Sequence, residues 1–158
     1  MNRTIQPAPV RRSVTVNASP ARAFQVFTAR MGDWWPRGKT VAASPHHSIV
    51  IEPRKGGRWF ERAEDGTESE WGVVLAWSPP DRLLLGWQLT AAFKFDPDFL
   101  TEVEVTFEAR DDGVTCVTLE HRNLERFGDA AEKTRASLDG GWPSFLKVFA
   151  DFIDADGD

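Results

Sequence analysis

Apolar and polar residues alternate along much of the chain with the period of two that is typical of β-strands. The clearest example is the segment 102–109, in which Val103, Val105 and Phe107 share one face while three glutamates share the other. This pattern predicts an antiparallel strand with one face in the core and one in water. Similar alternation predicts further strands at 10–16, 48–52, 58–62, 70–77, 83–90 and 115–121.

Two segments instead have apolar residues at helical spacing. Ser19 and Pro20, residue types that favour a helix start, precede a helix that we expect to end at Gly32. A second helix is expected after Gly140 and Gly141, where an apolar stripe recurs every three or four residues. A strand, a helix, a run of strands and a last helix together predict an α+β fold. The stripe of the last helix consists of Trp142, Phe145, Leu146, Phe149 and Ile153.

Strand register assigns candidate side chains to faces. His121 shares a face with the apolar residues of 115–121, so we expect it to point into the core. Glu70 falls on the outer face of its strand, and Val74 is expected to share that face. Glu61 lies in a strand too short to fix its register, and surface exposure is the favoured interpretation for this carboxyl group.

Aromatic residues are unusually frequent: the chain has seven tryptophans and eleven phenylalanines but no tyrosine. Each buried ring removes about 150–250 Å² from water, and many large rings pack imperfectly, which favours a pocket between the sheet and the last helix. An ordinary aromatic core is the alternative. Rings in connecting segments often close a pocket mouth. The predicted ligand-binding residues are Trp34, Trp35, Trp59, Trp71, Trp87, Phe93, Phe95, Phe107, His121, Trp142, Phe145 and Phe149.

Charge and hydropathy exclude several classes of function. The net charge of −5, with acidic and basic residues interleaved, argues against a nucleic-acid-binding surface. Membrane insertion is not expected, because no apolar run approaches the roughly 20 residues that cross a bilayer. The segment 1–15 has no apolar stretch typical of a secretory signal. Cys116 is the single cysteine, so no internal disulfide forms. These features predict a cytoplasmic protein.

Several short motifs occur in an order that resembles a known superfamily. They are Ile51-Glu52-Pro53-Arg54-Lys55-Gly56-Gly57-Arg58-Trp59, Asp65-Gly66, Trp71-Gly72, Pro79-Pro80-Asp81-Arg82-Leu83, Thr118-Leu119-Glu120-His121 and Gly141-Trp142. Together they resemble the START-like (SRPBCC, Bet v allergen-like) superfamily, and within it the homologues of the C-terminal domain of the heat-shock-protein-90 ATPase activator. The resemblance spans about residues 10–153, and we expect one START-like domain over 1–158.

This resemblance implies a helix-grip fold, in which a seven-stranded antiparallel sheet curves around a long C-terminal helix. It also implies two short helices after the first strand and an internal cavity. Members of the superfamily bind lipids, hormones, polyketides or chaperones, and a few are enzymes, so the fold does not select a function.

Few residues offer catalytic chemistry. His121 is the best polar candidate, because a neutral imidazole at an inward strand end can orient a ligand or move a proton, although a structural histidine is the more common case. Glu61 is a weaker candidate for a general acid near it. His46 and His47 are adjacent and point opposite ways, which predicts a solvated loop rather than a metal site. No metal or cofactor is expected.

Three functions fit these observations. The favoured one is a binding protein for a small hydrophobic or aromatic ligand, without catalysis. The second is an enzyme of the cyclase, dehydratase or hydrolase type that uses His121 inside the pocket. The third is an accessory protein of the stress response that activates a chaperone ATPase, which rests on the resemblance alone. A chaperone and a second copy of the chain remain open as partners.

Overall fold

The computed structural model describes residues 7–36, 39–41 and 46–156. Its strands form one antiparallel sheet in the order β1-β7-β6-β5-β4-β3-β2, which confirms the predicted seven-stranded α+β architecture. The strands are β1 (Val10–Val16), β2 (His46–Ile51), β3 (Arg58–Ala63), β4 (Glu68–Ser78), β5 (Arg82–Trp87), β6 (Thr101–Ala109) and β7 (Thr115–Arg122). The helices are α1 (Pro20–Ala29), α2 (Met31–Trp34), α3 (Ala131–Asp156) and the 3₁₀ segments η1 (Asp111–Gly113) and η2 (Leu124–Ala130).

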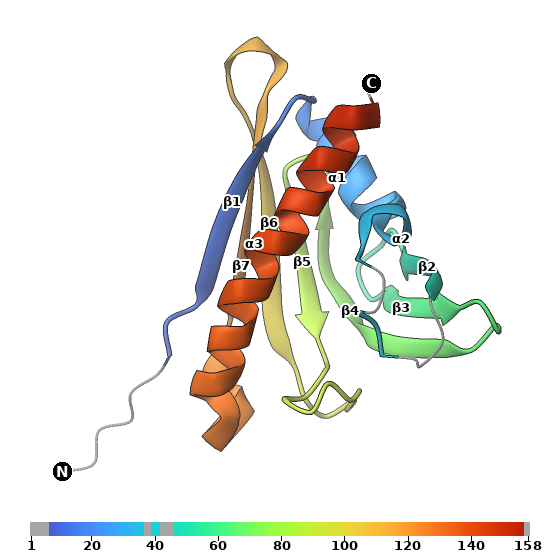
Figure 1. Cartoon of the computed structure of the whole chain (residues 1–158), viewed down its shortest axis with the longest axis vertical. Coiled ribbons are helices and arrows are strands. Elements are labelled where there is room, and N and C mark those ends of the chain that lie inside the picture. Colours follow the sequence, from blue (N-terminus) through green and yellow to red (C-terminus); the bar gives the residue numbers. More distant parts are fainter. Residues whose placement is uncertain (1–6, 37–38, 42–45, 157–158) are drawn as a thin grey trace.

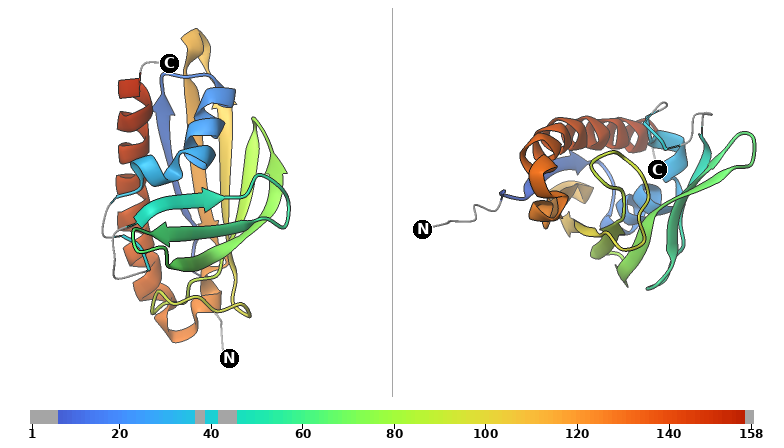
Figure 2. Two further views of the ribbon diagram at one scale, coloured as in Figure 1. Left: turned by 90° about the vertical axis from the view of Figure 1, so that its right-hand side faces the viewer. Right: turned by 90° about the horizontal axis from the view of Figure 1, so that it is seen from below.

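The sheet curls, and α3 crosses its concave side (Figure 1). Seen from below, the curled sheet and α3 enclose a space into which α1 and α2 also fit (Figure 2). This is the helix-grip arrangement that the resemblance implied, including the two short helices after β1. None of the helices in the described part of the chain is both long enough and apolar enough to cross a membrane.

Large rings fill the deep part of this space. The ring of Phe27 lies with its centroid 5.2 Å from that of Trp34, 5.9 Å from Phe107 and 5.3 Å from Phe149. All four side chains are at most 3% exposed. Burial of this much apolar surface is the main force that holds α1, α2 and α3 against the sheet. These rings are therefore core.

The helix α1 is shorter than predicted. Its N-terminus is the expected one, because the hydroxyl of Ser19 accepts a hydrogen bond from the backbone N–H of Arg22 at 3.2 Å. The expected end at Gly32 is wrong, since the non-helical Arg30 ends α1 and Gly32 lies inside the separate helix α2.

The helix α3 is longer than predicted. It begins at Ala131 and runs through Gly140, Gly141 and Pro143 without a break. The glycine that interrupts the helical backbone is Gly128, which has a φ of 64° and precedes α3. The extra turns form the N-terminal half of α3, which lies beside the pocket described below.

The alternation predicted for β4 fails after Trp71, because the strand contains two register shifts. Gly72 pairs with Trp59 while Glu70 pairs with Phe60, so Trp71 is an extra residue of a β-bulge. A second shift lies between residues 74 and 76. Val74 consequently points into the core and is 1% exposed, which corrects the outward orientation predicted for it.

Candidate functional site

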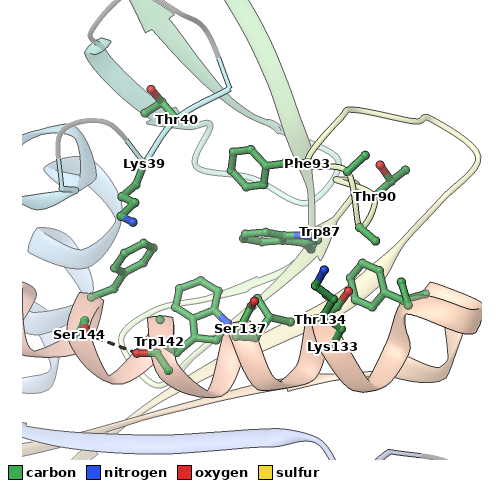
Figure 3. Close-up of a pocket in the computed structure, with 18 of the residues that line it drawn as sticks. Lys39, Thr40, Trp87, Thr90, Phe93, Lys133, Thr134, Ser137, Trp142 and Ser144 are labelled. Atoms are coloured by element: carbon green, nitrogen blue, oxygen red, sulfur yellow. Dashed lines mark hydrogen bonds between the residues drawn. The ribbon is translucent and has the colours of Figure 1, made fainter.

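The described part of the chain contains a pocket of about 980 Å³ beside the N-terminal half of α3. Its other walls are the loop after β5 and the segment that precedes β2 (Figure 3). The lining residues are Trp35, Lys39, Thr40, Trp87, Thr90, Ala91, Ala92, Phe93, Phe127, Ala130, Lys133, Thr134, Ser137, Leu138, Gly140, Gly141, Trp142, Ser144 and Phe145.

Five of the predicted aromatic residues come together in this lining, and they come from four parts of the chain. Trp35 and Phe145 lie with ring centroids 4.5 Å apart, and Trp142 is 5.7 Å from Phe145. Trp87, at the end of β5, is 5.7 Å from Trp142 and 6.3 Å from Phe93. The rings form one continuous apolar wall, which suits a flat aromatic guest.

Phe93 stands at the tip of the loop after β5. Its φ of 61° is in the left-handed region, which is unusual for a residue with a bulky side chain. The turn is closed by hydrogen bonds from the N–H of Phe93 to the carbonyl of Thr90 at 2.8 Å and from the N–H of Thr90 to the carbonyl of Lys94 at 2.9 Å. The ring is 38% exposed. Phe95, 39% exposed, is outside the lining.

Polar side chains complete the pocket, and the sequence analysis did not identify them. Hydroxyl groups come from Thr40, Thr90 and three residues of α3, and ammonium groups from Lys39 and Lys133 (Figure 3). Thr134, Ser137 and Lys133 were missed because the helix was expected to start after Gly141, and Ser144 was missed because it is not part of the apolar stripe. A signal was nevertheless present: the small or polar side chains Thr134, Ser137, Gly141 and Ser144 recur every three or four residues.

His121 points inward as predicted and is fully buried. The indole N–H of Trp142 donates to its Nδ1 at 3.1 Å, so the ring proton resides on Nε2, which lies 2.8 Å from the hydroxyl oxygen of Thr101. Burial lowers the pKa of His121 to about 3, and the ring is neutral near pH 7. His121 is not among the lining residues of the pocket. This arrangement fits a structural histidine.

Glu61 is fully buried in β3, so its favoured exposure was wrong. Its Oε1 accepts hydrogen bonds from the indole N–H of Trp71 at 2.7 Å and from the backbone N–H of Val41 at 2.5 Å. The register of β3 was ambiguous because Phe60 on the opposite face is buried as well, beneath the guanidinium of Arg58 at 3.8 Å. Glu61 and His121 are not hydrogen-bonded to each other.

The other predicted residues lie away from the pocket. Trp34, Phe107 and Phe149 are core, as described above. Trp59 and Trp71 are also buried, with ring centroids 5.5 Å apart. The hollow predicted between the sheet and the last helix is filled by rings around His121, since the ring of Trp87 lies 5.2 Å from that of His121. The open space lies beside the N-terminal half of α3.

The two adjacent histidines, His46 and His47, differ in burial. His46 begins β2 and is fully buried, with its Nε2 2.9 Å from the carbonyl oxygen of Gly32, which corrects the predicted solvated loop. His47 is exposed. Among the described residues, no three His, Cys, Asp or Glu side chains are grouped in a way that could hold a metal ion.

The curled seven-stranded sheet closed by a C-terminal helix defines the START-like, helix-grip class of proteins. Residues 17–154 match the family model described as activator of Hsp90 ATPase homolog 1-like protein, and the chain belongs to this family. No curated protein sequence matches it.

Two solved structures are similar in both sequence and fold. Txn09, described as an anthrahydroquino-γ-pyrone synthase, is 39% identical with a TM-score of 0.66, over 92% of this chain and 97% of Txn09. CalC from Micromonospora echinospora, described as a self-sacrificing resistance protein, is 37% identical with a TM-score of 0.71, over 95% of this chain and 96% of CalC. A protein from Mesorhizobium loti, at 19% identity and a TM-score of 0.66, shows the fold alone.

Proposed function

We propose that the protein binds a small, planar aromatic molecule in the pocket beside α3. The observation that carries this proposal is the convergence of six aromatic side chains from five parts of the chain on an open space of about 980 Å³. Pockets for molecules of drug size have volumes of about 300–1,000 Å³ and are lined mainly by apolar and aromatic groups. The observed pocket lies at the upper end of that range.

The two similar proteins support this ligand class. The name of Txn09 refers to a γ-pyrone joined to an anthrahydroquinone, which is a fused aromatic skeleton. CalC is described as a self-sacrificing resistance protein, which is compatible with a protein that takes up a toxic small molecule itself. Identities of 37–39% over nearly the whole of each chain favour a related small-molecule role here.

Titration with anthraquinone tests the proposal. Trp35, Trp87 and Trp142 line the pocket, so a bound quinone should quench tryptophan fluorescence saturably. Binding to the native state alone should also raise the melting temperature, by an amount that grows with ligand concentration. Cyclohexanol, which is polar and not aromatic, serves as the control ligand. A panel of two- to four-ring aromatic compounds that neither quenches nor stabilises would contradict the proposal.

A synthase that converts its ligand in the same pocket is the second candidate, favoured by the 39% identity to Txn09. The groups available for such a reaction are the hydroxyl and ammonium groups of the lining. His121 is not available, because it accepts a hydrogen bond from Trp142 and does not line the pocket. Mass spectrometry of bound aromatic compounds after incubation distinguishes the two candidates: a binder releases the ligand unchanged. The chaperone partner expected from the family stays a prediction.

A further inference from the structure

The pocket differs in charge from the chain that forms it. The protein has a net charge of −5. Among the described lining residues, however, the charged ones are Lys39 and Lys133, and both are cationic. A pocket that only excluded water would not need two cations in an otherwise acidic protein. The positive charge of the lining is therefore evidence about the charge of the ligand.

The two ammonium groups approach the pocket from different elements. Lys39 belongs to the segment before β2, where its carbonyl oxygen accepts a hydrogen bond from the indole N–H of Trp35 at 2.9 Å. The neighbouring Val41 is held by Glu61. Lys133 lies in the first turn of α3. In Figure 3 the side chain of Lys39 lies on one side of Trp87 and that of Lys133 rises from α3 on the other side.

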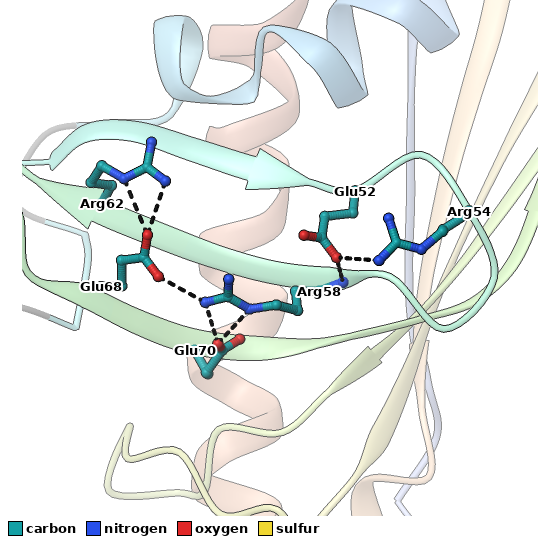
Figure 4. Close-up of polar contacts among 6 residues, drawn as sticks. All are labelled: Glu52, Arg54, Arg58, Arg62, Glu68 and Glu70. Atoms are coloured by element: carbon teal, nitrogen blue, oxygen red, sulfur yellow. Dashed lines mark hydrogen bonds and ion pairs between the residues drawn. The ribbon is translucent and has the colours of Figure 1, made fainter.

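Several cations elsewhere in the described part of the chain are paired with carboxylates. On the outer face of the sheet, Arg58 bridges Glu68 and Glu70, and Arg62 also contacts Glu68 (Figure 4). These carboxylates raise the pKa of Arg58 above its usual value. On α3 itself, Lys147 pairs with Asp151 at 2.8 Å.

The two pocket lysines have no such partner. Within the described part of the chain, no carboxylate lies within 4.0 Å of either ammonium group. Their charges are consequently available to a bound molecule. Both lysines are exposed, so it is a bound aromatic skeleton, by displacing water beside them, that would lower the local dielectric and strengthen an ionic contact.

We infer that the natural ligand carries an acidic oxygen, a carboxylate or an ionised phenol, on its aromatic skeleton, and that the positive charges of Lys39 and Lys133 attract this anion while the rings hold the skeleton. This inference rests on the proposed function and narrows it to aromatic acids. The hydroxyl groups of Thr134 and Ser137 on α3 are available to donate to the same oxygen.

A matched pair of probes tests the inference. Anthraquinone-2-carboxylate and anthraquinone-2-carboxamide have nearly the same shape but differ by one charge. At about pH 7 the protein should bind the carboxylate about tenfold more tightly. The preference should shrink between about 20 mM and about 500 mM NaCl, because salt screens partly exposed charges. In the Lys39→Met/Lys133→Met variant, the two affinities should become equal.

Lys147→Met is the matched control, since it removes one lysine charge from α3 outside the pocket. It should keep the preference for the carboxylate. Equal affinities in the unmodified protein would overturn the inference while leaving the proposed function intact. A preference that survives in the double variant would overturn the assignment to the two lysines. If neither probe binds, both proposals fail.

A second readout is independent of affinity. Alizarin is a hydroxyanthraquinone whose absorption changes when its phenol ionises. Two nearby cations favour the ionised form, so bound alizarin should ionise at a pH about one unit lower than free alizarin. The double variant should abolish this shift. An unshifted or raised ionisation pH in the unmodified protein would contradict the inference.

Discussion

The indole N–H of Trp142 donates a hydrogen bond to Nδ1 of His121, with 3.1 Å between the two nitrogens. This contact joins the last strand of the sheet to the middle of α3, directly behind the aromatic wall of the pocket. Because Nε2 faces the hydroxyl of Thr101 at 2.8 Å, both ring nitrogens have partners inside the protein. His121 thus fixes the position of a pocket residue without lining the pocket.

The buried histidine predicts a specific pH dependence of stability. Burial lowers the pKa of His121 to about 3, whereas an unfolded chain titrates near 6.5. The unfolded state therefore binds more protons than the folded state between these values. Stability should be complete above about pH 6.5 and fall by up to about 1.4 kcal/mol per pH unit below it, toward pH 3.

Urea unfolding at several pH values measures this slope. In His121→Gln the amide oxygen can still accept from Trp142 and the NH₂ group can face Thr101, but the side chain does not titrate. The difference in slope between the two proteins isolates His121, because all other titrating groups are common to both. Parallel stability curves below pH 6.5 would show that His121 is accessible to protons in the folded state.

The two exposed phenylalanines of the loop after β5 give a matched test of the pocket boundary. Phe93 lines the pocket and lies 6.3 Å from Trp87, whereas Phe95 has similar exposure outside it. We expect Phe93→Ala to weaken anthraquinone binding about tenfold, since loss of a stacked ring costs about 1 kcal/mol or more. Phe95→Ala should leave the affinity unchanged in the same fluorescence titration. Equal losses in both variants would mean that the sequence-based inclusion of Phe95 was justified.

Glu61 should act on the pocket through its rim. It holds Val41, which follows the lining residues Lys39 and Thr40. Glu61→Gln weakens this hydrogen bond and the one to Trp71, so we expect a loss of about 1–2 kcal/mol in unfolding free energy and a lower ligand affinity. Glu64→Gln is the control, because Glu64 is exposed in the next turn. Full stability with unchanged binding in Glu61→Gln would contradict this role.

Most of the fold could be predicted because strand periodicity depends on local sequence. The strands β6 and β7 have one wet face and one buried face, and their alternation fixed the inward orientation of His121. The strand β4 is the exception, because its two register shifts arise from close packing with neighbouring strands, and the apolar–polar pattern does not indicate such packing. A Cβ on Gly72 would lie 1.8 Å from the carbonyl oxygen of Gly86, so the two strands approach each other closely where the alternation changes.

The site was predicted only in part, for a physical reason that concerns α3. An amphipathic stripe marks the face of a helix that packs on a core. The first turns of α3 face a hollow instead, and a face that lines a hollow has no need of large apolar groups. Lys133, Thr134 and Ser137 therefore carry no apolar pattern that would mark them as part of a site. The tryptophans of the pocket were predicted because aromatic residue type was the criterion. The same criterion also selected aromatic residues that belong to the core.

Two adjacent glycines of α3 allow stability and binding to be separated. A Cβ at Gly140 or Gly141 would meet no atom within 4 Å, and neither glycine has a positive φ. Replacing either with alanine should stabilise the helix by about 0.5–1 kcal/mol. At 100° per residue, Gly141 lies between Thr134 and Ser137 around the helix, at the centre of the pocket face, and Gly140 lies at its edge.

Gly141→Ala should therefore raise the unfolding free energy and lower the affinity for anthraquinone, because the methyl group enters the space that the ligand uses. Gly140→Ala should give the same gain in stability with a smaller loss of affinity, because Gly140 lies at the edge of the pocket lining. Urea unfolding and fluorescence titration on the two variants measure both quantities. Equal affinities would place the ligand away from this face of α3, and a loss of stability in both would show that the helix needs glycine for its packing.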